Sequence, residues 1–248
     1  MRSFVLLLVL ALLVYSTSSF SRQIAIVIDD LGYSLINGKR SIDLPGDVTV
    51  AILPFAPNSI RLSEYAKHKN KELIVHLPMQ AKSETSQKIE RPTLNITMSS
   101  IQYAIILESS LSRFAHAKGL SNHMGSLLTE RIKPMRRVML ATANRNLYFL
   151  DSKTSSQSIA KKAAHEMRAP YIARDFFLDN IRTEQNMKSI MESAFTLSRK
   201  TGDAVIIGHP YQGTLDFLER ELQKLPSDIE LVFAGQLPTI DQAVVVLP

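Results

Sequence analysis

The chain has 248 residues, of which 45% are hydrophobic and 21% are charged, a composition typical of a globular protein rather than a disordered one. It contains no cysteine, which excludes disulfides, thiolate zinc sites and cysteine nucleophiles, so any metal chemistry must use His, Asp and Glu. The formal net charge of +6 is scattered without a basic stripe, and we therefore expect no binding to nucleic acid.

The N-terminal segment differs from the rest of the chain. A positive start at Met1-Arg2 precedes an unbroken apolar run, Phe4–Tyr15, and small residues follow it. This order predicts a secretory signal peptide over residues 1–21. The run is shorter than the roughly 20 apolar residues of a stable membrane span; an uncleaved N-terminal anchor is the alternative. In either case we expect residues 22–248 to form one domain outside the cytoplasm, in the periplasm.

After this segment, short apolar runs rich in β-branched residues alternate with segments of helical period, which predicts βα units. The expected strands are Ile24–Ile28, Val48–Leu53, Leu73–Leu77, Leu147–Leu150, Tyr171–Ala173, Ala204–Ile207 and Leu231–Ala234, with a further short one around Leu120. The expected helices are Ser59–His68, Ser99–Ala117, Ile132–Asn144, Ser156–Met167, Asn186–Lys200 and Leu215–Leu225. Periodicity alone does not separate an open doubly wound sheet from a closed barrel.

Four further segments carry expectations of their own. Ser99-Ser100 and Ser155-Ser156 precede helical runs and are expected to cap them. The polar stretch Ala81–Met98 is expected to form a surface loop over one end of the sheet. The apolar residues 243–246 fit either a last short strand or a tail, and the pattern does not decide between these.

Polar residues follow nearly every expected strand, and in βα proteins such positions collect the functional groups. These residues are Asp29-Asp30, His76, Asn122-His123, Asp151, Arg174-Asp175, Asp179-Asn180 and His209. Because the carboxyl ends of parallel strands meet at one end of a sheet, we expect many of these side chains to line a single pocket.

The Asp29-Asp30 pair is the most informative of these features. Adjacent carboxylates repel each other, and a divalent cation removes that cost, leaving one as a ligand and the other as a base toward an activated water. His76, His123 and His209 are the histidines at strand ends and can supply neutral nitrogen ligands. Each residue also has a structural interpretation: a turn for the aspartates, and a hydrogen-bonded core residue for His76. Their convergence favours a metal-dependent site.

Five segments resemble, in order, the motifs of the divergent polysaccharide deacetylase family. They are Ile24–Tyr33, His76–Met79, Asn122–Ser126, Arg174–Asn180 and Ile207–Pro210. The resemblance implies a distorted (β/α) barrel of about seven strands, related to the NodB-like carbohydrate esterases. It also implies a divalent metal, usually zinc, as the cofactor and a carbohydrate polymer or oligosaccharide as the partner.

The same resemblance implies roles for individual residues. Asp29 would be the catalytic base, Asp30 and His76 metal ligands, and His209 the acid that protonates the leaving amine. NodB-type enzymes place their second metal histidine four residues after the first, where this chain has Gln80, so His123 becomes the expected third ligand. The residues expected to line or support the pocket are Asn122, Asp151, Arg174, Asp175 and Asn180, with Arg174 orienting Asp29.

These observations predict a hydrolase that removes N-acetyl groups from an envelope polysaccharide with metal-activated water. The displaced second histidine leaves two alternatives open. One is a barrel that binds carbohydrate or regulates an envelope process without catalysis, and the other is a metal-dependent esterase or phosphodiesterase that uses the same ligands.

Overall fold

The computed structural model describes residues 22–83 and 92–239. The strands are β1 (Arg22–Leu31), β2 (Thr49–Ile52), β3 (Leu73–Met79), β4 (Gly119–Met124), β5 (Tyr148–Asp151), β6 (Tyr171–Ala173), β7 (Phe176–Phe177), β8 (Asp203–Gly208) and β9 (Ile229–Leu231). The α-helices are α1 (Leu35–Ile42), α2 (Ser59–His68), α3 (Ser100–Leu111), α4 (Ile132–Ala143), α5 (Ala160–Met167), α6 (Glu184–Thr201) and α7 (Gln212–Glu221). The predicted signal peptide and residues 243–246 lie outside the described residues.

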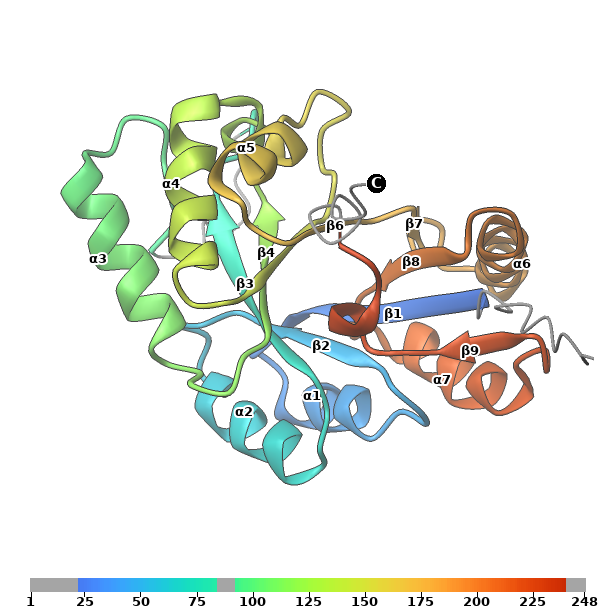
Figure 1. Cartoon of the computed structure of the whole chain (residues 1–248). Helices are drawn as coiled ribbons and strands as arrows, with labels where there is room; N and C mark the ends of the chain where they lie inside the picture. The colour runs from blue at the N-terminus through green and yellow to red at the C-terminus, as the bar shows by residue number, and fades with distance from the viewer. Residues whose placement is uncertain (1–21, 84–91, 240–248) are drawn as a thin grey trace, which may run out of the picture.

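The described strands form one parallel sheet in the order β6-β5-β4-β3-β2-β1-β8-β7, and β9 pairs with the start of β1. The edge strands β6 and β7 are separated in sequence only by Arg174 and Asp175. The chain itself therefore joins the two edges, and the sheet curls on itself with helices around the outside (Figure 1). This arrangement confirms the predicted distorted (β/α) barrel.

Several element boundaries differ from the sequence predictions. The two residues of β7 are too few to show a period, so the strand count of about seven was low. Helix α1 was missed because its sequence, LINGKRSI, is polar and contains a glycine. The last strand ends at Leu231 rather than beginning there, because a 3₁₀ turn occupies Ala234–Gln236.

The two predicted helix caps had different outcomes. Ser99 caps α3 with a reciprocal pair of hydrogen bonds to Gln102, which confirms that expectation. Ser155-Ser156 does not cap α5, because the helix begins only at Ala160 with Ile159 before it.

Two apolar clusters show which side chains face the barrel interior. The larger cluster contains Ile24, Ile26 and Ile28 together with residues of the helices, so it lies between sheet and helices. The smaller cluster is built from alternate residues of β1, β2, β3, β5, β6 and β8, and it therefore fills the inside of the barrel. Its members include Ala25, Val27, Ala51, Ile74, Tyr148, Leu150, Ile172, Val205 and Ile207.

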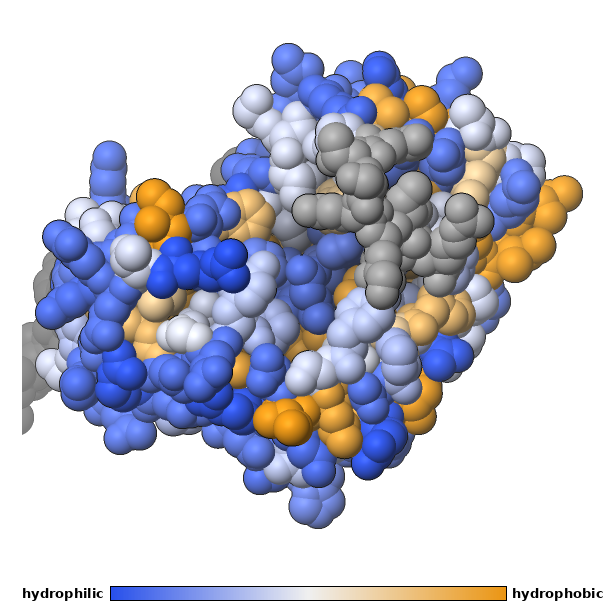
Figure 2. Space-filling view, turned by 180° about the vertical axis from the view of Figure 1, so that it is seen from behind, coloured by the Kyte–Doolittle hydropathy of each residue, from blue (hydrophilic) through white to orange (hydrophobic). Residues whose placement is uncertain are grey.

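The face of the molecule seen in Figure 2 is mostly hydrophilic. Figure 2 shows one face with a recess near its centre, lined by hydrophilic residues, and with separate apolar residues around it. No helix within residues 22–83 and 92–239 is long and apolar enough to cross a membrane. The described end of the predicted loop packs against the barrel, because Leu94 is buried and pairs with Met79 at the end of β3.

Candidate active site

A β-bulge at the end of β1 sets the positions of the two aspartates. Ile28 pairs with Val50 and Leu31 with Ile52, so three steps along β1 oppose two along β2. Asp30 sits inside this irregularity with φ 62°, a left-handed conformation that is uncommon for a residue with a side chain. Adjacent residues of a regular strand point to opposite faces. The bulge instead lets Asp29 and Asp30 both reach His76.

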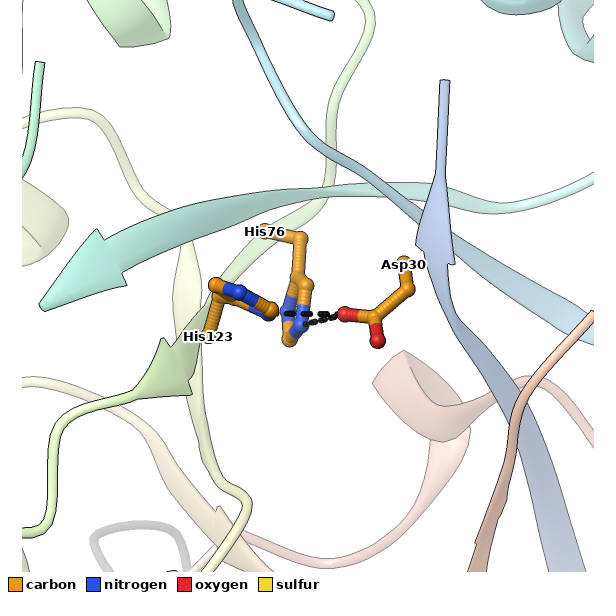
Figure 3. A group of neighbouring side chains, drawn as sticks. All are labelled: Asp30, His76 and His123. Carbon is orange, nitrogen blue, oxygen red and sulfur yellow. Dashed lines mark hydrogen bonds and ion pairs between the residues drawn. The ribbon is translucent and has the colours of Figure 1, made fainter. Parts of the chain in front are cut away.

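Asp30, His76 and His123 converge on one point at the carboxyl ends of β1, β3 and β4 (Figure 3). Asp30 Oδ1 lies 3.0 Å from His76 Nε2 and 2.7 Å from His123 Nδ1. The three potential ligand atoms all lie within 4.8 Å of one another. The structure thus brings together the three residues that the sequence marked as metal ligands.

The surroundings of this triad fit a divalent cation. Two imidazole nitrogens and a carboxylate oxygen are the donor set that zinc accepts in hydrolytic sites. Ser121 Oγ lies 2.7 Å from His76 Nδ1, and a hydrogen bond donated there by the ring leaves the Nε2 lone pair facing Asp30. Such a contact between a lone pair and a carboxylate is stable only with a cation, either a proton or a metal, between the two atoms.

Asp29 has the environment of a base rather than that of a structural carboxylate. Its side chain is 3% exposed, and its Oδ1 atom has no hydrogen-bond partner among the described residues. Its Oδ2 atom lies 3.5 Å from the Ser152 hydroxyl and 3.6 Å from His76 Nε2. Burial raises the pKa of Asp29, and the nearby charge of His76 opposes this only in part.

The pKa of Asp30 moves in the opposite direction. Burial acts to raise it, but the hydrogen bonds from His123 and His76 outweigh burial and hold the pKa well below its ordinary value. The two neighbouring carboxylates therefore differ. Asp30 is ionised, and its Oδ1 atom is hydrogen-bonded to both histidines. Asp29 has an oxygen without a partner among the described residues, and it binds a proton more strongly than Asp30 does. This difference matches a ligand and a base.

His209 follows β8 and is held by Asp179. Its Nδ1 and its backbone N–H lie 2.8 Å from the two carboxylate oxygens of Asp179, and Thr214 donates to the same carboxylate. Burial lowers the pKa of His209, but the hydrogen bond and charge of Asp179 prevail, with smaller contributions from Asp30 and Asp29, and raise it to about 9. The imidazole is therefore protonated at neutral pH, and Nε2–H is left to act as an acid.

Asn122 and Asp151, expected at the pocket, brace the strand ends instead. Asn122 donates to the Met124 carbonyl and accepts from the Ser152 backbone N–H, which ties the ends of β4 and β5 together. Asp151 accepts from the Ser158 and Tyr171 hydroxyls on the helix side of the sheet. Each of these two residues is adjacent in its strand to a residue that faces the barrel interior, so its own side chain points to the other face of the sheet.

Arg174 forms no hydrogen bond or ion pair with Asp29 among the described residues. Its guanidinium donates to the backbone carbonyls of Ser152 and Lys153 rather than forming the carboxylate pair that the sequence suggested. Because the Ser152 hydroxyl contacts Asp29, Arg174 supports the base through that residue.

Asp175 and Asn180 also lie apart from the triad. Asp175 accepts from the Val205 backbone N–H, which links β8 to the segment between β6 and β7. Asn180 is exposed. A cavity of about 830 Å³ is lined by Asp151, Arg174 and Asp175 among others, but its lining includes neither the triad nor Asp29 or His209.

Two residues of the site, Ser121 and Ser152, were missed by the sequence interpretation, and a third, Asp179, was named without a role. Ser121 and Ser152 each lie two residues from an inward-facing position, at His123 and Leu150 respectively, so strand alternation was the signal that could have found them. Asp179 was noted beside Asn180, but nothing in the pattern distinguished the buried residue from the exposed one.

Gln80, which stands where NodB-type enzymes have their second histidine, points away from the triad. Its side-chain oxygen accepts from the Ile96 backbone N–H, and its own backbone pairs with Leu94. The residue thus fastens the chain that returns over β3. His123, from the next strand, fills the third position of the triad in its place.

Comparison with known proteins identifies the family of this chain. The sequence profile of the divergent polysaccharide deacetylases matches residues 26–237. The chain is 36% identical over 234 residues to the uncharacterized protein YibQ of Escherichia coli K12, covering 93% of this chain and 73% of that protein. It is also 35% identical to an uncharacterized protein of Haemophilus influenzae Rd, covering 90% of this chain and 79% of that protein.

A solved structure shares the fold. The uncharacterized protein ATU2773 of Agrobacterium tumefaciens C58 superimposes with a TM-score of 0.80 at 22% identity, covering 86% of this chain and 87% of that one. The family profile matches nearly all of the described barrel, and this match shows that the chain belongs to the divergent polysaccharide deacetylase family.

Proposed function

We propose that this protein hydrolyses the N-acyl groups of an amino-sugar polymer of the cell envelope. The observation that carries the proposal is the placement of Asp30, His76 and His123 around one point, beside a buried carboxylate with a free oxygen and a protonated histidine. Ligand, base and acid are the three parts that metal-assisted amide hydrolysis requires. Membership of the family supports the carbohydrate substrate.

Asp30, His76 and His123 would hold the metal, for which zinc is our proposal. A bound divalent cation lowers the pKa of water and polarises an acyl carbonyl. Ser121 holds the ring of His76 in orientation through Nδ1, and the bulge at Asp30 presents the carboxylate to both histidines. Both supports are part of the strands themselves.

Asp29 is the base in this mechanism. Its free Oδ1 accepts a proton from the attacking water as the water oxygen bonds to the acyl carbon. The raised pKa of Asp29 makes the carboxylate a stronger proton acceptor than an aspartate on the surface. The Ser152 hydroxyl contacts the other carboxylate oxygen and leaves Oδ1 available.

His209 is the acid that completes the reaction. When the C–N bond breaks, the amine leaving group needs a proton, and His209 supplies it from Nε2 because Nδ1 is committed to Asp179. The products are a free amine on the sugar and a carboxylic acid. The Asp179 carboxylate keeps the imidazolium stable and correctly oriented, as the aspartate of a catalytic triad does.

The cellular location is part of the proposal. The positive start and apolar run of residues 1–21 favour export, and a substrate in the envelope is consistent with that. Export to the periplasm would place the barrel next to N-acetylated polymers. Detection of the protein in a periplasmic fraction, with or without removal of the segment, tests this part separately.

The decisive experiment combines metal analysis with an activity assay. The purified protein is expected to bind about one zinc ion, and Asp30→Ala and His123→Ala are expected to abolish that binding. Lys200→Ala, at the far end of α6, serves as the control. The metal-loaded protein should release acetate from chitooligosaccharides or peptidoglycan fragments. Failure of zinc and other divalent ions to bind would eliminate the hydrolase mechanism.

A second candidate function follows from Gln80. A barrel of this family that lacks the usual second histidine could bind carbohydrate, or regulate an envelope process, without hydrolysing it. In that case metal and oligosaccharide would bind while the acetyl groups remain in place under all conditions tested.

A further inference from the structure

Two arginine–aromatic pairs flank the acid His209. The Phe177 ring stacks against the imidazole with centroids 5.9 Å apart, and the Tyr211 ring lies near it at 5.8 Å. Arg174 lies over Phe177 at 3.7 Å, and Arg182 lies over Tyr211 at 4.4 Å. His209 therefore contacts two aromatic rings, the stacked Phe177 and the tilted Tyr211, and each of these rings also contacts a guanidinium.

The two guanidinium groups differ in the hydrogen bonds that their N–H groups form. Arg174 donates from Nε, Nη1 and Nη2 to three backbone carbonyls, so its charge is used to hold the chain after β5 and β6. Arg182 is exposed, and among the described residues the ring of Tyr211 is its one polar or aromatic contact. Stacking occupies a face of the guanidinium and leaves its in-plane N–H groups available.

An arginine arranged in this way is suited to bind an anion. A planar fork of N–H donors matches a carboxylate in a bidentate manner, and the ring beneath it reduces the freedom that binding would otherwise remove. Thr183 caps α6 directly after Arg182, which fixes the backbone on that side. Tyr211 is the N-cap residue of α7 and is exposed beside the acid.

We infer that Arg182 forms a subsite that binds a carboxylate of the substrate, and that the ring of Tyr211 positions the Arg182 guanidinium. The subsite lies on the side of His209, which protonates the leaving amine, so the carboxylate belongs to the amine-bearing part of the substrate. The substrate class is therefore an N-acylated amino sugar in a glycan that also carries a carboxylate. This inference rests on the proposed function for the identity of the leaving group.

The test is a pair of binding measurements that require no turnover. The probes are a disaccharide containing an N-acetylated amino sugar and a carboxylate, and the same disaccharide with the carboxylate reduced to an alcohol. Titration calorimetry with the full chain should show about 10-fold tighter binding of the acidic disaccharide, and the preference should shrink as salt is added. Arg182→Ala should bind both disaccharides equally.

Variants at Tyr211 separate positioning from charge alone. Tyr211→Phe keeps the ring and should keep the preference, whereas Tyr211→Leu should lose most of it although Arg182 is still present. Lys200→Ala removes one positive charge at the opposite end of the barrel and should behave as the wild type. Equal preference in the wild type and Arg182→Ala would overturn the subsite, as would failure of the wild type to bind or distinguish the two disaccharides.

The outcome also distinguishes this inference from the proposed function. If the protein prefers the acidic disaccharide through Arg182 but releases no acetate, the subsite proposal stands and the hydrolase proposal fails. Release of acetate from both disaccharides at equal KM, with equal binding, retains the hydrolase and removes the subsite.

Discussion

The two ends of the barrel surround their carboxylates in opposite ways, with a half-buried Glu72 at the amino end and a buried Asp29 at the carboxyl end. At the amino end, Glu72 Oε1 accepts hydrogen bonds from the Thr49 hydroxyl at 2.9 Å, the Tyr148 hydroxyl at 2.8 Å and the Gly235 backbone N–H at 3.0 Å. At the carboxyl end, Asp29 Oδ1 accepts none from the described residues. One oxygen has three donors, and the other is left without any.

This difference shows how a single barrel separates stability from chemistry. The donors around Glu72 tie together the starts of β2, β3 and β5 and the turn after β9, which closes the amino end. Burial without a hydrogen-bond donor at Oδ1 raises the pKa of Asp29, so this oxygen binds a proton more readily than an exposed carboxylate does. The lack of partners that makes Asp29 costly to bury is also what makes it useful in catalysis.

The largest expected effect is on activity at the carboxyl end. Asp29→Asn keeps the shape of the side chain but removes the base, so kcat should fall by about 10²–10⁴-fold. The melting temperature should stay the same or rise, since a buried carboxylate without a full set of partners is replaced by a neutral group. Acetate release and thermal unfolding measure the two effects. Wild-type activity in this variant would remove Asp29 from the mechanism.

The next effect is on stability at the amino end. Glu72→Ala leaves three donors without their acceptor and should lower the free energy of unfolding by about 3 kcal/mol, at roughly 1 kcal/mol for each hydrogen bond. Chemical denaturation measures the loss. Glu72→Gln, which keeps an acceptor oxygen, should lose less. The folded fraction should retain its metal binding and kcat, and a kcat loss like that of Asp29→Asn would show that the two ends are not independent.

The smallest expected effect is on the pH dependence of activity, which tests the role of His209 at the carboxyl end of the barrel. A histidine acid works only while protonated, so activity should be lost as pH rises through the pKa of His209, which is about 9. Asp179→Asn removes the charge that raises this pKa, and the alkaline limb should move down toward the ordinary histidine value of 6.5. Near pH 6 the variant should approach wild-type activity. A pH–rate profile measures the shift. If the alkaline limb does not move in Asp179→Asn, the group that titrates there is not His209.

Much of the site could be predicted because its residues stand at the ends of recognisable strands. Asp29, Asp30, His76, His123 and His209 each follow or end an apolar run, and a parallel sheet collects such positions at one end. The runs themselves, such as residues 24–28, are apolar at every position because both faces are buried. The pattern therefore shows where a strand ends without showing which of its side chains face the interior.

That missing orientation accounts for the residues that were misplaced. Asp151 and Ser152 are neighbours at the end of β5, yet Ser152 faces Asp29 while Asp151 turns toward the helices. Asp179 holds His209 while Asn180 is exposed. Only the closed barrel, with its alternating interior cluster, decides between such neighbours.

The sequence by itself determined the βα order, the family motifs and the kinds of chemical group present, because these depend on local pattern and residue type. The tertiary structure decided that two adjacent aspartates act at one site, because a bulge in β1 turns Asp30 to φ 62°. It also placed His123 at the position that Gln80 does not fill. Both outcomes depend on the register between neighbouring strands, which residues far apart in the chain set together.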